Sequence, residues 1–447
     1  MTARAKVACA GIAFAAASTL VHRAVRGQGV DVERPRTIVV GHAACGAPMD
    51  RVDTARTGLA RTFLPSTALH SPWRISLAMP VDHAPLIDAR GQIYVVGNRG
   101  ELVTVSPGGD ERWRVSTGGV QAGPAALLSD DTVVFVDAAG EALGVREGSL
   151  RFRTKIGSPN AARAAPLPLD DGGVVVAAGR AFAALDSQGR ERARIELPEA
   201  SANPIVAAMG KVVIVTTSGA VWIWAPGAAE AIQVGTFGTP IDGGAGLADD
   251  HTLIAVTATH AHLCAVDLVG GTTTVRASSP GDLWLGPPAM FGSTANLTAL
   301  SAAGERRISV DAAGVETLYS VVAHKGSAPD GGLDSWLPLA RTPPLIDASD
   351  RMAFATLDGS VAVDEGSTAM SRVEVERLAH VCSPEPAGTA KSDCPIAGLA
   401  PLRPHTFVAV CRCGTVVAVE GDVRGEAATS VSGQADSRTG ERCQGHL

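Results

Sequence analysis

The sequence has few aromatic residues and no long segment with the apolar spacing of a helix. Phe, Trp and Tyr make up 4% of the 447 residues, which argues against the aromatic platforms on which proteins stack nucleic-acid bases. No segment carries an apolar stripe with a period of about 3.6 residues that is long enough for paired helices. The formal net charge of -7 also disfavours nucleic acid and anionic lipid as general partners. These features exclude an α-solenoid and argue against a nucleic-acid-binding protein.

The sequence also lacks the short motifs of common enzymes. It contains no Gly-x-Ser-x-Gly elbow, no His-Glu-x-x-His pair, no phosphate-binding glycine loop and no EF-hand loop. His260 and His262 are spaced to share one face of a strand, but no third ligand is predicted beside them. We therefore predict no catalytic residues and no metal ligands.

What the sequence does contain is a unit that recurs about every forty residues. The first copy opens at Ala84-Pro85-Leu86, continues through Val-rich strands separated by Gly and Asp turns, and closes at Trp113-Arg114-Val115. Seven later copies open near residues 123, 165, 203, 244, 288, 344 and 400. Four short strands cannot bury both faces of their sheet alone, whereas radial stacking buries each face on a neighbour. We predict an all-β, eight-bladed β-propeller of four-stranded antiparallel blades; the number is seven if the weak fifth or the widened sixth copy is not a blade.

The segment 72–77 precedes the first copy but matches the closing-strand pattern of residues 112–116. The eighth copy has no closing strand of its own, so this N-terminal strand is predicted to complete the last blade and close the ring. The resulting divisions are a signal peptide or signal anchor (1–26), a lead-in segment (27–70), the propeller (71–422) and a polar C-terminal tail (423–447).

The N-terminus predicts export, because Arg4 and Lys6 precede an apolar run over residues 7–21 that is short for a membrane-spanning helix. Removal of residues 1–26 would take four positive charges and no acid, and so change the formal charge from -7 to -11. A periplasmic or secreted location is expected, with membrane attachment only if the signal segment is retained.

An oxidising compartment favours disulfides among the seven cysteines that follow the signal. Cys382 and Cys394 flank an irregular stretch and are the first candidate pair, and Cys413 with Cys443 would staple the tail. Cys264 lies inside a predicted strand, where a thiol packs as a small apolar group. The alternative for Cys411-Arg412-Cys413 is a redox-active or metal-binding pair.

In such a blade, the second hairpin turn and the connector to the next blade emerge at the same end, where ligands are expected. The binding-face candidates there are Arg99, His260, Trp284, Trp336, Asp358 and Arg412. His260 also fits an ordinary turn residue, and the two tryptophans also fit the packing of long connectors onto the ring. Asp pairs at 130–131, 170–171 and 249–250 recur at one blade position, which predicts hairpin turns on the opposite face.

The motifs Ala184-Leu185-Asp186-Ser187-Gln188-Gly189 and Ala265-Val266-Asp267-Leu268-Val269-Gly270, with the Trp-Arg closing strand, resemble the repeat of PQQ-like propellers. Quinoprotein dehydrogenases and the lipoprotein of the outer-membrane β-barrel assembly machinery share this fold, and the resemblance covers roughly residues 50–422. Those dehydrogenases would be expected to have an adjacent Cys-Cys pair, a catalytic Asp and calcium ligands, whereas the close pair here is Cys411-x-Cys413.

We therefore expect a non-catalytic, exported propeller without a cofactor, which binds or scaffolds another protein of the bacterial cell envelope. The alternative is a PQQ-dependent, dehydrogenase-like enzyme with PQQ and calcium, or a sensor of a small ligand, that uses the central funnel.

Overall fold

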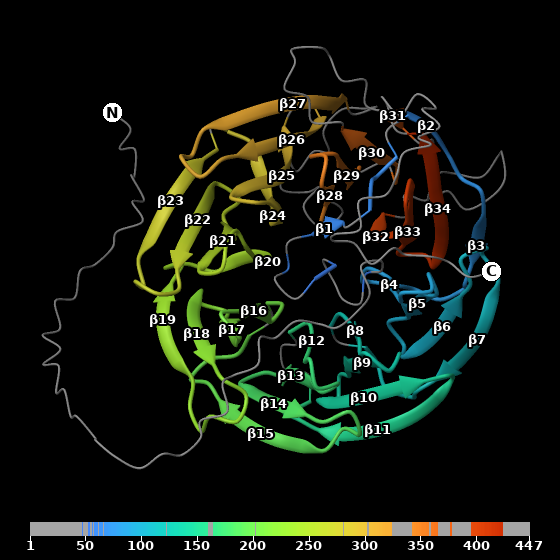
Figure 1. Cartoon of the computed structure of the whole chain (residues 1–447), viewed down its shortest axis with the longest axis vertical. Coiled ribbons are helices and arrows are strands. Elements are labelled where there is room, and N and C mark those ends of the chain that lie inside the picture. Colours follow the sequence, from blue (N-terminus) through green and yellow to red (C-terminus); the bar gives the residue numbers. More distant parts are fainter. Residues whose placement is uncertain are drawn as a thin grey trace, which may run out of the picture.

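The chain folds as eight β-sheets that surround a common centre, as Figure 1 shows for a computed structural model. The structure describes residues 47, 52–53, 56, 58–60, 62–65, 67–121, 123–159, 164–201, 203–279, 281–301, 304–323, 342–356, 359–364, 376–377 and 395–422. None of these residues belongs to a helix of the length and apolarity that crossing a membrane would need. The prediction of an all-β propeller with eight blades is confirmed.

The first four blades each use four consecutive antiparallel strands, from the innermost to the outermost. Blade 1 contains β4 (Leu86–Ile87), β5 (Ile93–Val96), β6 (Glu101–Val105) and β7 (Glu111–Ser116). Blade 2 contains β8 (Ala126–Leu127), β9 (Val133–Val136), β10 (Glu141–Arg146) and β11 (Ser149–Lys155). Blade 3 contains β12 (Leu167–Pro168), β13 (Val174–Ala178), β14 (Ala181–Leu185) and β15 (Glu191–Glu196). Blade 4 contains β16 (Val206–Ala208), β17 (Lys211–Val215), β18 (Ala220–Trp224) and β19 (Ile232–Thr236).

The next two blades follow the same plan, whereas blades 7 and 8 also take strands from the N-terminal segment. Blade 5 contains β20 (Ile241–Leu247), β21 (Thr252–Thr257), β22 (His262–Asp267) and β23 (Thr273–Ser278). Blade 6 contains β24 (Leu283–Phe291), β25 (Thr294–Ser301), β26 (Gly304–Val310) and β27 (Glu316–Ala323). Blade 7 contains β1 (Leu59–Ala60), β28 (Leu345–Asp347), β29 (Met352–Ala355), β30 (Val361–Asp364) and β31 (Glu376–Arg377). Blade 8 contains β32 (Ile396–Arg403), β33 (Thr406–Cys411), β34 (Thr415–Asp422), β2 (Thr67–His70) and β3 (Arg74–Ser76).

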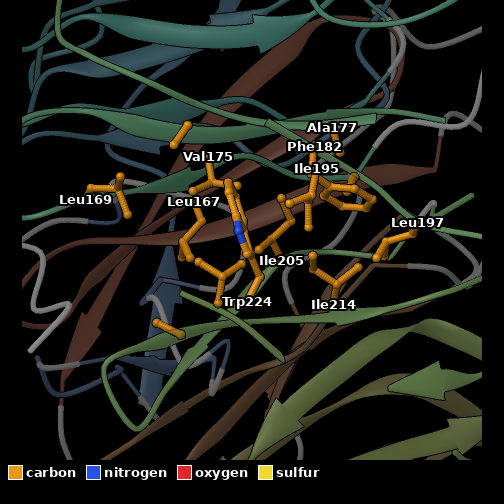
Figure 2. Close-up of a cluster of buried hydrophobic side chains, with 14 of the residues drawn as sticks. Leu167, Leu169, Val175, Ala177, Phe182, Ile195, Leu197, Ile205, Ile214 and Trp224 are labelled. Atoms are coloured by element: carbon orange, nitrogen blue, oxygen red, sulfur yellow. The ribbon is translucent and has the colours of Figure 1, made fainter. Parts of the chain in front are cut away.

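The hydrophobic core is divided among the interfaces between neighbouring blades. Figure 2 shows the cluster in which Phe182 of blade 3 packs with Ile214 and Trp224 of blade 4. Further clusters join blades 1 and 2, 2 and 3, 4 and 5, and 5 and 6. Burial of one Val, Leu or Ile side chain contributes about 1.5–3 kcal/mol. Each interface buries such side chains from both blades, so this stabilisation is lost when either neighbour is absent.

Aspartates shape the hairpin turns through their side chains. The Oδ1 atoms of Asp130, Asp171 and Asp249 accept the backbone N–H two residues further on, at 3.1, 3.0 and 2.9 Å. This Asx arrangement replaces a main-chain hydrogen bond and favours a tight turn. The prediction that the Asp pairs are turn residues is confirmed.

The ring is closed by the strand that precedes the first copy. β3 pairs antiparallel with β34, and Arg74 lies opposite Val417. The indole N–H of Trp73 donates to the carbonyl of Pro107 in blade 1 at 2.9 Å. Gly109 has a φ of +95°, and a Cβ there would approach the Trp73 ring to 2.7 Å, so glycine leaves room for the indole. The predicted closure is confirmed.

Candidate functional site

The second hairpin turn of a blade and the connector that enters the blade share one face of the ring. The N–H groups of Asn98, Ala138 and Ala258 in these turns donate to the carbonyls of Pro80, Val120 and Pro240 in the connectors, at 2.9, 2.7 and 2.9 Å. This repeated hydrogen bond places the turns and connectors together, as predicted. We call this side the connector face.

Two of the predicted binding residues lie in neighbouring turns on the connector face. Arg99 is exposed in blade 1, and Arg412 is partly buried in blade 8. The segment 77–81 runs between them: Asn98 N–H donates to Pro80, and Val81 N–H donates to the carbonyl of Arg412 at 2.9 Å. Of the remaining candidates, Trp336 and Asp358 lie outside the described residues.

His260 lies on the connector face but is buried, and it joins two blades. Its Nδ1 is 3.0 Å from the carbonyl of Trp284 and 3.5 Å from Asp242 Oδ2. Because a carbonyl only accepts, this Nδ1 carries a proton and donates. His262 instead contacts Ser278 Oγ through its own Nδ1 at 2.8 Å. The two histidines therefore have separate structural contacts.

Trp284 was predicted on a connector, and that placement was wrong. It belongs to β24 and is fully buried among Ile254, Met290 and Leu297 between blades 5 and 6. Strand β24 runs from Leu283 through Gly286, Pro287 and Pro288 to Phe291, and within it the side chain of Trp284 faces the core. Trp284 cannot serve as a platform for a ligand.

The centre of the ring contains the chain's own N-terminal segment. Ala47 forms an antiparallel bridge with Ile87 of β4, and β1 pairs in parallel with β28. The N–H of Leu64 donates to Asp347 Oδ2 at 2.8 Å. These partners belong to β4 of blade 1 and to β28 of blade 7, and Figure 1 shows β1 near the middle of the ring.

Arg56 extends this segment to blades 3 and 4. Its guanidinium is fully buried; Nε donates to the carbonyl of Ile205 at 3.1 Å, and Nη2 donates to those of Ala165 and Pro166 at 3.3 and 2.7 Å. A guanidinium group is planar and carries five N–H donors, so one arginine side chain can donate to several carbonyls at once. Sequence reasoning missed Arg56, because its partners are more than a hundred residues away. We call the described residues between 47 and 65 the central segment.

Within the described ranges, no three His, Cys, Asp or Glu side chains are grouped to hold a metal ion. The described chain also passes through the centre, where the funnel alternative places its ligand.

Among the described cysteines, Cys411 takes part in a disulfide, whereas the sequence predicted one at Cys413. Cys411 is buried at the end of β33 and is disulfide-bonded. Cys413 is an exposed thiol in the turn, with Sγ 3.6 Å from Thr415 Oγ1. Cys264 is a buried thiol, as predicted. Cys382, Cys394 and Cys443 lie outside the described residues.

The arginine of the closing strand is a second feature whose role the sequence did not reveal. Arg114 Nη2 donates to Leu77, Arg153 Nη2 to Thr117, and Arg194 Nη1 to Ile156, at 3.1, 2.9 and 2.6 Å. Each acceptor is the carbonyl that follows the closing strand of the preceding blade. These arginines therefore fasten blades 1, 2 and 3 to their neighbours. The hydrogen bond from Arg114 also lowers the pKa of Glu111 below its usual value.

The repeat and the ring define the class of the protein: it is an eight-bladed β-propeller whose repeats resemble those of PQQ-like propellers. Residues 71–228 match the family described as outer membrane protein assembly factor BamB.

Solved structures with the same fold are distant in sequence. BamB from Moraxella catarrhalis is 16% identical with a TM-score of 0.54, and the match covers 79% of this chain and 100% of that one. A europium-containing methanol dehydrogenase is 9% identical with a TM-score of 0.57, over 85% and 98% of the two chains. The computationally designed Ika8 protein is 10% identical with a TM-score of 0.54, over 80% and 99%. These likenesses concern the fold alone, and no curated protein matches.

Proposed function

We propose that this protein is a protein-binding module of the bacterial cell envelope, and that it acts as a rigid scaffold without catalysis. The observation that carries the proposal is the central segment. Arg56 and β1 occupy the middle of the ring, so binding falls to the outer surface and the connector face. The match of residues 71–228 to an outer membrane assembly factor supports the envelope as the setting.

The ring suits a scaffold for physical reasons. Blade interfaces with interlocking cores resist bending, because each blade is buried against both neighbours. Such a disc holds exposed turns such as that of Arg99 at fixed positions, and preorganised surfaces lose little conformational entropy on binding. We propose that the N-terminal segment directs export of the protein. We also propose that its function needs no nucleic acid, metal or cofactor.

Site-specific photo-crosslinking in living cells tests the proposal. A photoreactive residue is placed at exposed positions of the connector face, Arg99 and Val120, and of the outer rim, Ile232. We expect a discrete adduct with one envelope protein from at least one position, identified by mass spectrometry. A position at buried Trp284 serves as a negative control.

The enzyme alternative is tested on the purified protein by calorimetric titration with PQQ and calcium, and by a dye-linked alcohol oxidation assay. The proposal predicts neither heat of binding nor turnover. Stoichiometric binding with turnover, together with no adduct from any surface position, would overturn it.

A further inference from the structure

The interface between blades 6 and 7 differs from the other seven interfaces of the ring. Each of the others contains an apolar cluster to which both neighbouring blades contribute. Beside blade 6, blade 7 has a small cluster of its own, which consists of Met352, Phe354 and Ala362. In the described part of the chain, blades 6 and 7 therefore share no apolar cluster.

The alternation of the strands shows which side chains face this interface. In blade 6, Leu297 and Ile308 pack on blade 5, so the residues that alternate with them point toward blade 7. In blade 7, Ala353 packs on blade 8, which leaves its neighbours Met352 and Phe354 for the side of blade 6. The middle strands of blade 6 present polar side chains there, with Leu300 as the exception, and all are buried: Asn296, Thr298 and Leu300 of β25, and Glu305, Arg307 and Ser309 of β26.

An ion pair joins the two blades across this interface. The guanidinium of Arg307 is fully buried; Nη1 donates to the carbonyl of Asp350 at 2.7 Å, and Nη2 donates to Asp350 Oδ1 at 2.5 Å. Asn296 Oδ1 accepts from Nε and Nη2 of the same arginine, at 3.1 and 2.7 Å. Two buried polar atoms on this face have no hydrogen-bond partner, namely Asn296 Nδ2 and Thr298 Oγ1.

Separation of a polar interface costs less free energy than separation of an apolar one. Apolar side chains lose the whole free energy of burial when they meet water, whereas polar groups exchange a protein partner for water at a small net loss. Asn296 Nδ2 and Thr298 Oγ1 gain partners on separation, because both are unpaired in the closed interface. The ring therefore opens at the lowest cost between blades 6 and 7.

The central segment limits this opening to the outer part of the two blades. The carbonyl of Gly58 accepts the N–H of Ile346 in blade 7 at 3.0 Å, and a Cβ at Gly58 would lie 3.4 Å from that of Ala289 in blade 6. The inner ends of both blades thus contact the same residue. Blade 7 also keeps its shared core with blade 8, so it can leave blade 6 without unfolding.

We propose that the interface between blades 6 and 7 is a joint at which the native ring opens and closes while every blade stays folded. The pair of Arg307 and Asp350 holds the closed state, and Gly58 of the central segment is the pivot. In the open state, the polar face of blade 6 and the side chain of Met352 meet solvent. This joint goes beyond the proposed function, which needs only the surface of the ring.

Oxidation of methionine by dilute hydrogen peroxide tests the joint on the purified wild-type chain, with peptide mass spectrometry as the readout. Met352 faces blade 6 and Met290 faces blade 5, and their side chains are 0% and 1% exposed. We expect Met352 to be oxidised about tenfold faster or more, because only its interface opens readily. Met209, which is 39% exposed, gives the rate of an accessible side chain. A rate at Met352 that is equal to or below that at Met290 would overturn the proposal.

Hydrogen exchange under the same conditions distinguishes the joint from unfolding of blade 7. The amides of β29 and β30 pair with each other inside the blade, so we expect them to stay protected while Met352 reacts. If they exchange as fast as Met352 becomes accessible, the blade unfolds as a whole and the joint is refuted.

Two variants should shift the joint in opposite directions. Asp350→Asn removes the charge that holds Arg307 and should speed the oxidation of Met352 about fivefold. Thr298→Val replaces an unpaired hydroxyl by a methyl group and should slow it by a similar factor, because the closed state loses an unsatisfied group.

Asp171→Asn is the matched control for the charge. It removes an ion pair with Arg192 inside blade 3 and should leave the rate at Met352 unchanged. Equal effects of the two aspartate variants, or an unchanged or faster rate in Thr298→Val, would contradict the joint.

Discussion

Replacing Arg56 by alanine tests whether the central segment is part of the folded ring. The guanidinium is fully buried and donates to the carbonyls of Ile205, Ala165 and Pro166. Of these, Ala165 also accepts the N–H of Ile205 at 3.4 Å. Alanine therefore leaves the other two carbonyls without this donor.

The expected loss of unfolding free energy is about 2–4 kcal/mol. A buried polar group left unsatisfied costs about 1–3 kcal/mol, and two such groups set the upper part of the range. Removing a buried charge recovers part of this cost. Arg56→Lys should restore only part of the stability, because an ammonium group cannot reproduce the planar fork of donors.

The assay is equilibrium unfolding in urea, combined with hydrogen exchange at the innermost strands of blades 3 and 4. Arg99→Ala is the control, because it removes the same charge from an exposed side chain and should change stability by less than about 0.5 kcal/mol. Equal stability of the two variants, with unchanged exchange at Ile205, would refute the placement of Arg56 in the centre.

Three further outcomes follow from the structure. Trp73→Ala should lower the unfolding free energy by about 2–4 kcal/mol, since it removes packing and a hydrogen bond at the closure of the ring; unchanged stability would contradict this role. The hydrogen bond from Arg192 lowers the pKa of Asp171 from its usual 3.8, so its stabilisation is present above that pH and is lost as the pH falls through the folded value. The difference in urea midpoint between wild type and Asp171→Asn should therefore vanish in acid, and a difference that persisted would count against the pair. Cys413 should react with a maleimide in the native protein and Cys264 only after unfolding, whereas equal rates would mean that Cys264 is accessible.

Repetition made the fold predictable from the sequence. A Pro-apolar start and Gly or Asp turns recur with every copy, so each weak local signal is read several times. The closing strand was found because residues 72–77 resemble 112–116, and the structure pairs β3 with β34 accordingly. Asp130, Asp171 and Asp249 were recognised as turn residues for the same reason.

The misplaced and missed residues lie where the repeat is broken. Trp284 lies close to Gly286, Pro287 and Pro288, residues that usually weaken or end a strand, so the sequence predicted a connector there. Arg56 occurs once, outside the repeat, and its partners depend on the closed ring. Cys411 and Cys413 are two residues apart at the end of a strand, and the sequence alone did not show which one is buried.

The outer strand of blade 4 differs from those of blades 1, 2 and 3. In blades 1, 2 and 3, the outer strands carry charges, and an arginine on each fastens it to the preceding blade. In blade 4 the charges and the arginine are both absent, while apolar side chains such as Ile232 and Val269 face solvent. An exposed edge without charge is prone to unwanted pairing. In blade 4 the next blade covers part of this edge, because Thr273 Oγ1 donates to the carbonyl of Thr236.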